Sequence, residues 1–220
     1  MSEPLTCSQC GRAFTLPPAV KERYPGWVPA RCKDCHGSAS GPKRAKRPSG
    51  TAGRGRGGPR EDNLTIAEVL ARYDGGPDDG VFTDGSADPN PGPGGWGAVY
   101  VVEGEIVDEA WGHEPATTNN RMELTALIAG YDLVPPGVAT TVYTDSRLAV
   151  DTVTKWAAGW QRRGWRRKSG PVENVELVKA LYERATARPE IRLQWIRAHA
   201  GARWNEYADA LSTAYRREVR

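Results

Sequence analysis

Two stretches decide the fold of this chain: Val81-Phe-Thr-Asp84-Gly-Ser86 and Thr141-Val-Tyr-Thr-Asp145-Ser146. Each is a short run rich in β-branched and aromatic residues, which predicts a strand, and each leads into an aspartate followed by small polar residues. In open α/β sheets, ligands gather at the carboxyl ends of neighbouring strands. We therefore expect Asp84 and Asp145 to stand side by side, although either acid alone also fits a helix cap or a surface charge.

Hydrophobic periodicity extends this α/β interpretation over residues 63–220. Gly97–Val102 and Ile106–Trp111, joined by Glu103-Gly104-Glu105, predict an antiparallel hairpin, and Ile191–Ile196 predicts another strand. The expected helices are Thr65–Tyr73, Arg121–Leu133, Ser146–Trp156, Val175–Thr186 and Asn205–Arg216. In the first helix, Ile66, Val69, Leu70 and Tyr73 are expected to face inward. Strands that alternate with helices indicate parallel pairing within a mixed sheet that helices cover.

The bulk composition is that of a globular protein with a basic leader. Hydrophobic residues make up 39% and charged residues 26% of the chain. No apolar run approaches the roughly 18 residues of a membrane helix, and the first residues lack a signal-peptide pattern, so we expect a cytoplasmic protein without a membrane partner. Residues 1–62 hold 12 basic and 5 acidic residues, a balance of +7, whereas residues 63–220 hold 18 and 22, a balance of −4. This asymmetry favours an arm that anchors the chain to a polyanion, although a solvated linker without a partner also fits.

The cysteines form two C-x-x-C pairs, Cys7/Cys10 and Cys32/Cys35, separated by 21 residues. This spacing predicts a tetrahedral four-thiolate site for a structural Zn²⁺, with Gly11 suited to the turn. Disulfides and free thiols are the alternatives, and a reducing cytoplasm disfavours the disulfides. We predict a zinc-ribbon-like module over residues 1–37, whose folding free energy the metal supplies.

Residues 38–62 predict a flexible linker. Ser38–Arg60 is rich in Gly, Pro and Ser and carries seven Lys and Arg with no acid, so it can also track a phosphate backbone. We expect residues 63–78 to form a short lead-in helix and residues 79–220 to form the catalytic domain.

Two further acids, Glu123 and Asp209, lie on predicted helices. Carboxylates that converge with Asp84 and Asp145 would repel one another unless a cation neutralised them. Ligation by oxygen alone favours Mg²⁺ or Mn²⁺ over zinc. Periodicity leaves this cluster and four separate surface acids about equally plausible.

A series of motifs runs through residues 79–218: Phe82-Thr-Asp84-Gly-Ser86, Asn90-Pro-Gly-Pro-Gly-Gly95, Thr117-Thr-Asn-Asn-Arg-Met-Glu123, Thr144-Asp145-Ser146, Gln161-Arg-Arg-Gly-Trp165, Pro171-Val-Glu-Asn174 and Ala198-His199-Ala-Gly201 with Asn205 and Asp209. In these motifs, their order and their spacing, the chain resembles the type I ribonuclease H family. The resemblance implies a five-stranded mixed sheet in the order 3-2-1-4-5 and a monomer. It also implies an endoribonuclease that hydrolyses the RNA strand of RNA–DNA hybrids and leaves 5′-phosphate and 3′-hydroxyl ends.

The resemblance assigns catalytic roles to five residues. Asp84, Glu123, Asp145 and Asp209 would hold two Mg²⁺ ions (or Mn²⁺), which clamp the scissile phosphate. His199, on a loop that Gly201 can flex, would shuttle protons or help product release, as suits an imidazole.

The resemblance also implies substrate contacts. Asn90, Asn119 and Asn120 match positions that read the minor groove, where 2′-hydroxyls mark the RNA strand. Thr118 and Asn174 match positions that grip a phosphate of the DNA strand, and Trp156 matches a ring that lines the DNA channel. Trp156 belongs to Thr154–Lys168, a stretch with six basic residues that resembles a basic protrusion, in which we expect Trp160 and Trp165 to pack internally. Arg147 departs from the family, which often has Gln there, so its contact with substrate stays open.

Three other interpretations fit part of this pattern. A related transposase, integrase or proofreading exonuclease shares clustered acids but not the Thr117–Glu123 run. A catalytically dead hybrid-binding module would usually have lost a carboxylate, and all four are present. A zinc module that docks a protein partner, instead of nucleic acid, is compatible with the nuclease.

Overall fold

The computed structural model describes residues 4–7, 10–16, 18, 21, 28, 32 and 63–218. The expectations for the linker at residues 38–62 and for Cys35 therefore lie outside the described residues. Within them, no helix is both long and apolar enough to cross a membrane.

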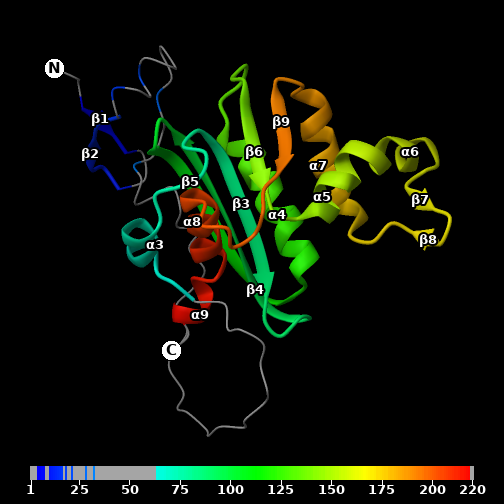
Figure 1. The fold of residues 1–220 in the computed structure, drawn as a ribbon. Coiled ribbons are helices and arrows are strands. Elements are labelled where there is room, and N and C mark those ends of the chain that lie inside the picture. Colours follow the sequence, from blue (N-terminus) through cyan, green and yellow to red (C-terminus); the bar gives the residue numbers. More distant parts are fainter. Residues whose placement is uncertain are drawn as a thin grey trace, which may run out of the picture.

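A five-stranded sheet forms the centre of the molecule (Figure 1). Its strands are β3 (Gly80–Ala87), β4 (Gly92–Val102), β5 (Glu105–Thr117), β6 (Thr140–Thr144) and β9 (Ile191–Trp195). They lie in the order β5-β4-β3-β6-β9, with β3–β4 and β4–β5 antiparallel and β3–β6 and β6–β9 parallel. The predicted order 3-2-1-4-5 and the mixed pairing are confirmed.

Helices cover both faces of this sheet (Figure 1). The α-helices that the structure describes are α3 (Ile66–Arg72), α4 (Asn119–Leu133), α5 (Arg147–Asp151), α6 (Ala157–Arg162), α7 (Val175–Ala187), α8 (Arg203–Ser212) and α9 (Tyr215–Glu218), of which α6 stands away from the sheet. Two short strand pairs complete the described elements: β1 (Leu5–Thr6) with β2 (Ala13–Phe14), and β7 (Arg166–Arg167) with β8 (Gly170–Pro171).

Alternation along the strands divides the core into two layers, because successive side chains of a strand point to opposite faces. Val81, Ala98 and Tyr100 belong to the layer that includes residues of α4 and α7. Phe82 and Val99 belong to the layer that includes residues of α8 and of α3. The two layers hold the helices that carry Glu123 and Asp209 against opposite faces of the same strands.

The N-terminal segment contributes to the first layer. Leu16 is buried in the same cluster as residues of the central sheet, and Leu5 and Phe14 pack against that cluster. The part of the N-terminal segment that the structure describes thus shares apolar contacts with the main domain.

Several predicted bounds were wrong. β3 runs past Asp84 to Ala87, because Gly85, Ser86 and Ala87 continue the ladder with β4. Ser146–Trp156 is α5 followed by a π-helical segment, Thr152–Trp156, after which α6 runs to Arg162. Leu70, predicted to face inward, is 40% exposed, because α3 buries one narrow face around Val69 and the next residue turns away from it.

The last predicted helix, Asn205–Arg216, is also interrupted. α8 ends at Ser212, and a turn separates it from α9. The Thr213 hydroxyl donates to the carbonyl of Asp209 at 2.9 Å, and the Ser212 hydroxyl oxygen lies 3.0 Å from the same carbonyl. Such local side-chain bonds compete with the helical ladder.

Candidate active site

Two glycines bring the acid-bearing helices close to the sheet. A Cβ on Gly85 would lie 2.2 Å from the backbone carbon of Met122 and 2.3 Å from the backbone nitrogen of Glu123. A Cβ on Gly97 would lie 2.4 Å from Cβ of Leu211, on α8. Only glycine permits these approaches, so α4 and α8 reach the strands where Asp84 stands.

Asp84 and Asp145 come from adjacent parallel strands, as predicted. The register of β3 and β6 ends with the pair Thr83 and Thr144. The residues that follow them, Asp84 and Asp145, therefore stand at the same level just beyond this pairing. Electrostatics shows that Glu123 joins them: burial, then repulsion from Asp84 and then from Glu123, raises the pKa of Asp145 from 3.8 to about 7. Three predicted ligands from β3, α4 and the end of β6 therefore share one site.

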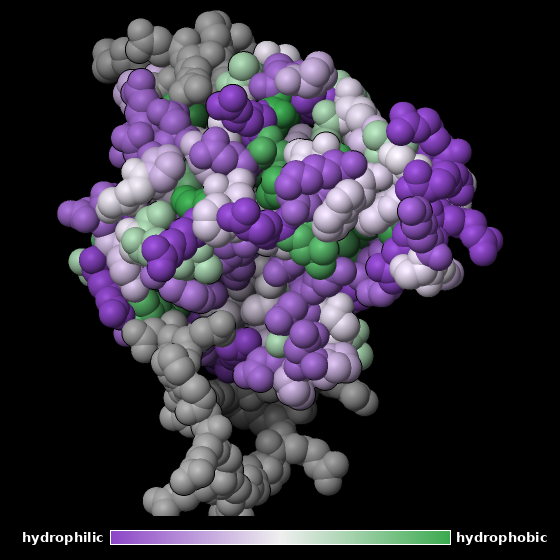
Figure 2. Space-filling view, turned by 45° about the vertical axis from the view of Figure 1, so that its right-hand side comes forward, coloured by the Kyte–Doolittle hydropathy of each residue, from purple (hydrophilic) through white to green (hydrophobic). Residues whose placement is uncertain are grey.

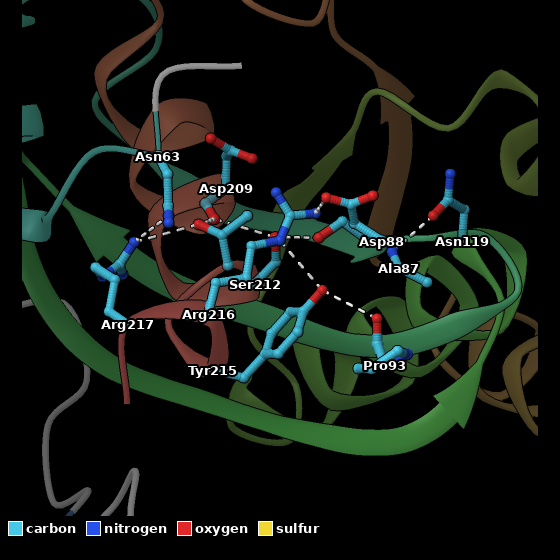
Figure 3. Close-up of polar contacts among 12 residues, drawn as sticks. Asn63, Ala87, Asp88, Pro93, Asn119, Asp209, Ser212, Tyr215, Arg216 and Arg217 are labelled. Atoms are coloured by element: carbon cyan, nitrogen blue, oxygen red, sulfur yellow. Dashed lines mark hydrogen bonds and ion pairs between the residues drawn. The ribbon is translucent and has the colours of Figure 1, made fainter. Parts of the chain in front are cut away.

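Serine hydroxyls orient two of these carboxylates. Ser146 Oγ donates to Glu123 Oε2 at 2.5 Å, and Ser212 Oγ donates to Asp84 Oδ2 at 2.6 Å. Burial raises the pKa of Glu123, the bond from Ser146 opposes this rise, and Asp84 adds to it. Ser212 stands one turn beyond Asp209 on α8 (Figure 3). The same helix therefore carries a predicted ligand and supplies the hydroxyl that donates to the Asp84 carboxylate.

His199 lies on the loop that precedes α8, with a backbone φ of 48°. Its side chain is 54% exposed, and Nδ1 lies 3.9 Å from Oε2 of the buried Glu206. The other carboxylate oxygen of Glu206 accepts the Gly201 N–H at 3.2 Å. His199 also lowers the pKa of Asp145, so the imidazole is within electrostatic range of the acids.

The predicted groove asparagines meet at the start of α4. Asn119 Oδ1 accepts the N–H of Ala87 at 2.6 Å, and Asn90 Oδ1 accepts the N–H of Asn119 at 3.2 Å. Figure 3 shows the Asn119 amide nitrogen directed away from Ala87. Asn120 lines a pocket whose wall includes Leu148, Trp160 and Arg167.

The two predicted phosphate-gripping residues are linked through Arg121. Thr118 caps α4 by accepting the Arg121 N–H at 3.4 Å. Asn174, with a left-handed φ of 49°, accepts from Nη1 of Arg121 at 3.2 Å. Arg121 also pairs with Glu176 at 2.7 Å, which fixes the guanidinium between α4 and the start of α7.

Trp156 lies 39% exposed at the end of the π-helical segment, and its ring centroid is 5.8 Å from that of Trp160. Trp160 and Trp165 pack against the main core cluster, as expected. Beyond them, α6, β7 and β8 stand away from the sheet, and Figure 2 shows a strongly hydrophilic surface on that side. Arg162, Arg163, Arg166 and Lys168 are exposed there.

A second cluster involves the cysteines. Cys7, Cys10 and Cys32 offer sulfurs within 4.8 Å of one another, and none of the three forms a disulfide. The Sγ atoms of Cys10 and Cys32 lie 3.6 Å apart, close to the roughly 3.8 Å expected when two sulfurs each sit about 2.3 Å from a tetrahedral zinc. Gly11 has a φ of 70° and donates to the Cys7 carbonyl at 2.9 Å, which forms the predicted turn.

The sequence interpretation missed Ser146, Ser212 and Glu206 as supports of the site. Ser146 follows Asp145 directly, and Ser212 lies three residues after Asp209, so it shares a helix face with that acid. Glu206 lies three residues before Asp209 and is 7% exposed at its side chain. Helical spacing from Asp209 would have indicated Ser212 and Glu206, because residues three positions apart share a helix face.

The sheet order and the acids at the ends of its parallel strands define an α/β domain with an acidic site. The RNase H family profile matches residues 78–216, and the chain belongs to the ribonuclease H family. It is 49% identical over 139 residues to "Ribonuclease H" of Methylorubrum extorquens (strain PA1), covering 63% of this chain and 60% of that protein. It is 45% identical to "Ribonuclease H" of Granulibacter bethesdensis over 63% of this chain and 91% of that protein.

A solved structure shows the same fold with recognisable sequence similarity. LC9-RNase H1, described as a type 1 RNase H with the type 2 active-site motif, has a TM-score of 0.54 and 33% identity. The alignment covers 67% of this chain and 76% of that one. Residues 1–77 lie outside the family match.

Proposed function

We propose that the chain is an endoribonuclease that hydrolyses the RNA strand of RNA–DNA hybrids with the help of divalent cations. The observation that carries this proposal is the shared site of Asp84, Glu123 and Asp145, in a domain that belongs to the ribonuclease H family. Membership of that family entails dependence on a divalent metal, and the site has the donors that such a metal needs.

The residues fit Mg²⁺ or Mn²⁺. The donors are all carboxylate oxygens. Burial, and then repulsion from Asp84 and Glu123, raises the pKa of Asp145 to about 7, and a divalent cation would remove that repulsion. Asp84, Glu123, Asp145 and Asp209 would hold two such ions, which supply activation of a water molecule and stabilisation of the leaving 3′-oxygen. The products would carry 5′-phosphate and 3′-hydroxyl ends.

The chain's own groups would prepare the site. Ser212 donates to one oxygen of Asp84, and Ser146 donates to one oxygen of Glu123, which fixes the plane of each carboxylate. Glu206 is buried and restrains the loop at His199 and Gly201, so the imidazole stays near the acids while remaining exposed to exchange protons with water. This arrangement suits proton transfer or product release.

Recognition of RNA would rest on the asparagines. In Asn90 and Asn119 the carbonyl oxygen is used within the protein, which leaves the amide nitrogen of each as a donor to a 2′-hydroxyl. Thr118 and Asn174, linked by Arg121, would bind a phosphate of the DNA strand. Trp156 and the basic protrusion would hold the DNA strand at a greater distance from the active site.

A substrate panel tests the proposal. The full chain is incubated with Mg²⁺ and end-labelled RNA–DNA hybrid, RNA duplex, DNA duplex and DNA containing one ribonucleotide. We expect cleavage of the hybrid's RNA strand, no cleavage of either homoduplex and poor cleavage at the single ribonucleotide. Equal cleavage of RNA duplex and hybrid would refute hybrid specificity, and efficient cleavage at one ribonucleotide would place the chain in another subclass.

We also propose that Cys7, Cys10, Cys32 and Cys35 hold a structural Zn²⁺ in a small N-terminal module. The 3.6 Å separation of two sulfurs and the Gly11 turn support this metal. We expect one zinc per chain in metal analysis of the purified protein, and loss of it in the Cys7→Ser/Cys10→Ser double variant. A protein purified with supplemented zinc that contains none would refute the site.

The module and the basic linker would tether the enzyme to nucleic acid. The charge balance of +7 over residues 1–62 supports this role. A gel shift of the full chain and of a Glu61–Arg220 chain on hybrid, duplex and single strands separates nucleic-acid anchoring from docking of a protein partner. Equal shifts for both chains would favour the protein partner.

A further inference from the structure

An exposed arginine stacks on an exposed tryptophan beside the acidic site. Arg147 is the first residue of α5, two positions after Asp145, and Trp195 is the last residue of β9. The central guanidinium carbon of Arg147 lies 4.3 Å from the centroid of the Trp195 ring, and Trp195 is 37% exposed. A charged side chain is therefore held against an apolar ring at the surface.

The backbone of Asp145 anchors this stack. The indole Nε1 of Trp195 donates to the Asp145 carbonyl at 3.0 Å. Trp195 also pairs in register with Thr144, and the next residue, Ile196, donates its N–H to the Thr144 carbonyl at 2.9 Å. The ring, and with it the guanidinium, is thus fixed to the strand end that delivers Asp145 to the site.

In the part of the chain that the structure describes, Arg147 has no acidic partner, although acids lie nearby. Among the residues that the structure describes, no carboxylate lies within the 4.0 Å ion-pair distance of Arg147. Stacking uses a face of the guanidinium and leaves its N–H groups, which lie in the plane, available to an anion. A planar fork of this kind suits two oxygens of one phosphate.

We propose that Arg147 binds a backbone phosphate of the RNA strand next to the one that is cut, and that Trp195 positions the guanidinium for this contact. This inference rests on the proposed function, because it needs the scissile phosphate to sit at Asp84, Glu123 and Asp145. The arginine gives the site a positive charge that neither a glutamine nor any of the groove asparagines provides. It would raise affinity for hybrid and make that affinity dependent on salt.

The test compares steady-state cleavage by wild type, Arg147→Gln and Arg192→Gln from about 50 to about 300 mM KCl. Arg192 is the matched control: it is exposed on the same strand, β9, but its register partner is Thr141, near the start of β6. For Arg147→Gln we expect KM to rise about 5- to 20-fold at the lowest salt, with kcat nearly unchanged. The slope of log KM against log salt should shrink by about 0.7–0.9, the value for one phosphate contact. Arg192→Gln should match wild type.

Trp195→Phe tests the positioning role. It removes the indole N–H bond to Asp145 while keeping an aromatic ring, and its effect on KM should largely vanish in the Arg147→Gln background, because both changes remove one contact. Independent, multiplicative effects of the two changes would overturn the positioning role. A KM for Arg147→Gln that equals wild type at every salt concentration would overturn the phosphate contact. A rise in KM with an unchanged salt slope would overturn it too, in favour of an uncharged groove contact. Failure of wild type to cleave hybrid would instead refute the proposed function.

Discussion

Substituting Gly85 by alanine should move Glu123 away from Asp84. The new Cβ would lie 2.2 Å from the Met122 backbone carbon and 2.3 Å from the Glu123 nitrogen, whereas ordinary contacts begin at 3.4 Å. Helix α4 must therefore retreat by about 1.2 Å, and no flexible side chain can yield instead, because the obstructing atoms are backbone. Overpacking of this kind costs about 1–3 kcal/mol or more.

Two measurements check this prediction. The melting temperature should fall by about 2–12 °C, from roughly 2–4 °C per kcal/mol for a domain of this size. The turnover number on RNA–DNA hybrid should fall by about 100-fold, because a displacement near 1 Å at a reacting centre has that effect. Gly159→Ala is the control: its nearest neighbours are side-chain atoms of Arg163 at 3.4 Å, and alanine in the helix α6 should be neutral or stabilising. A Gly85→Ala protein with wild-type melting and turnover would refute the claim that this close approach positions Glu123.

Two further predictions concern stability and tethering. Tyr207→Phe should lower the free energy of unfolding by about 1–3 kcal/mol, because the Tyr207 hydroxyl donates to the buried Glu109 at 2.6 Å. The control Tyr182→Phe should change little, because the Tyr182 hydroxyl has no hydrogen bond among the described residues. Equal urea midpoints for the two variants would contradict this prediction. A chain shortened to begin at Glu61 should keep its turnover number and melt at a lower temperature, because Leu16 no longer covers the core. It should bind hybrid more weakly than the full chain does, and this difference in affinity should be larger at low salt than at high salt. Equal affinity of the two chains at every salt concentration would exclude tethering to nucleic acid.

The sequence predicted the sheet well because its strands carry strong local signals. Val81–Asp84 and Thr141–Asp145 are apolar runs with acids at matched positions, and the parallel pairing of β3 with β6 follows from their shared need for burial. The meeting of Asp84 with Asp145 was predictable for the same reason. Element ends were less predictable, since β3 extends past Asp84 only because Gly94 and Gly95 on another strand pair with it.

Helical spacing places Ser212 on the same face as Asp209, but local patterns could not show which group each supporting residue contacts. Ser212 donates to Asp84 across 128 positions, and Trp195 donates to the Asp145 carbonyl across 50. Such contacts depend on how helices and strands pack and not on periodicity within either segment. The same holds for Leu16, whose burial against the main domain follows from tertiary contacts and has no signature in the cysteine pattern.

The most direct test of the account is single-turnover cleavage of RNA–DNA hybrid by Asp145→Asn. The matched control is Asp151→Asn, at the last residue of the following helix α5, where the carboxylate pairs with Lys155. Asp145→Asn should lose several orders of magnitude in cleavage rate in Mg²⁺ while still binding hybrid, because one ligand charge is lost and the groove and phosphate contacts remain. Asp151→Asn should cleave like wild type. Retention of more than about a tenth of wild-type activity by Asp145→Asn would contradict the assignment of the acidic site as the catalytic centre.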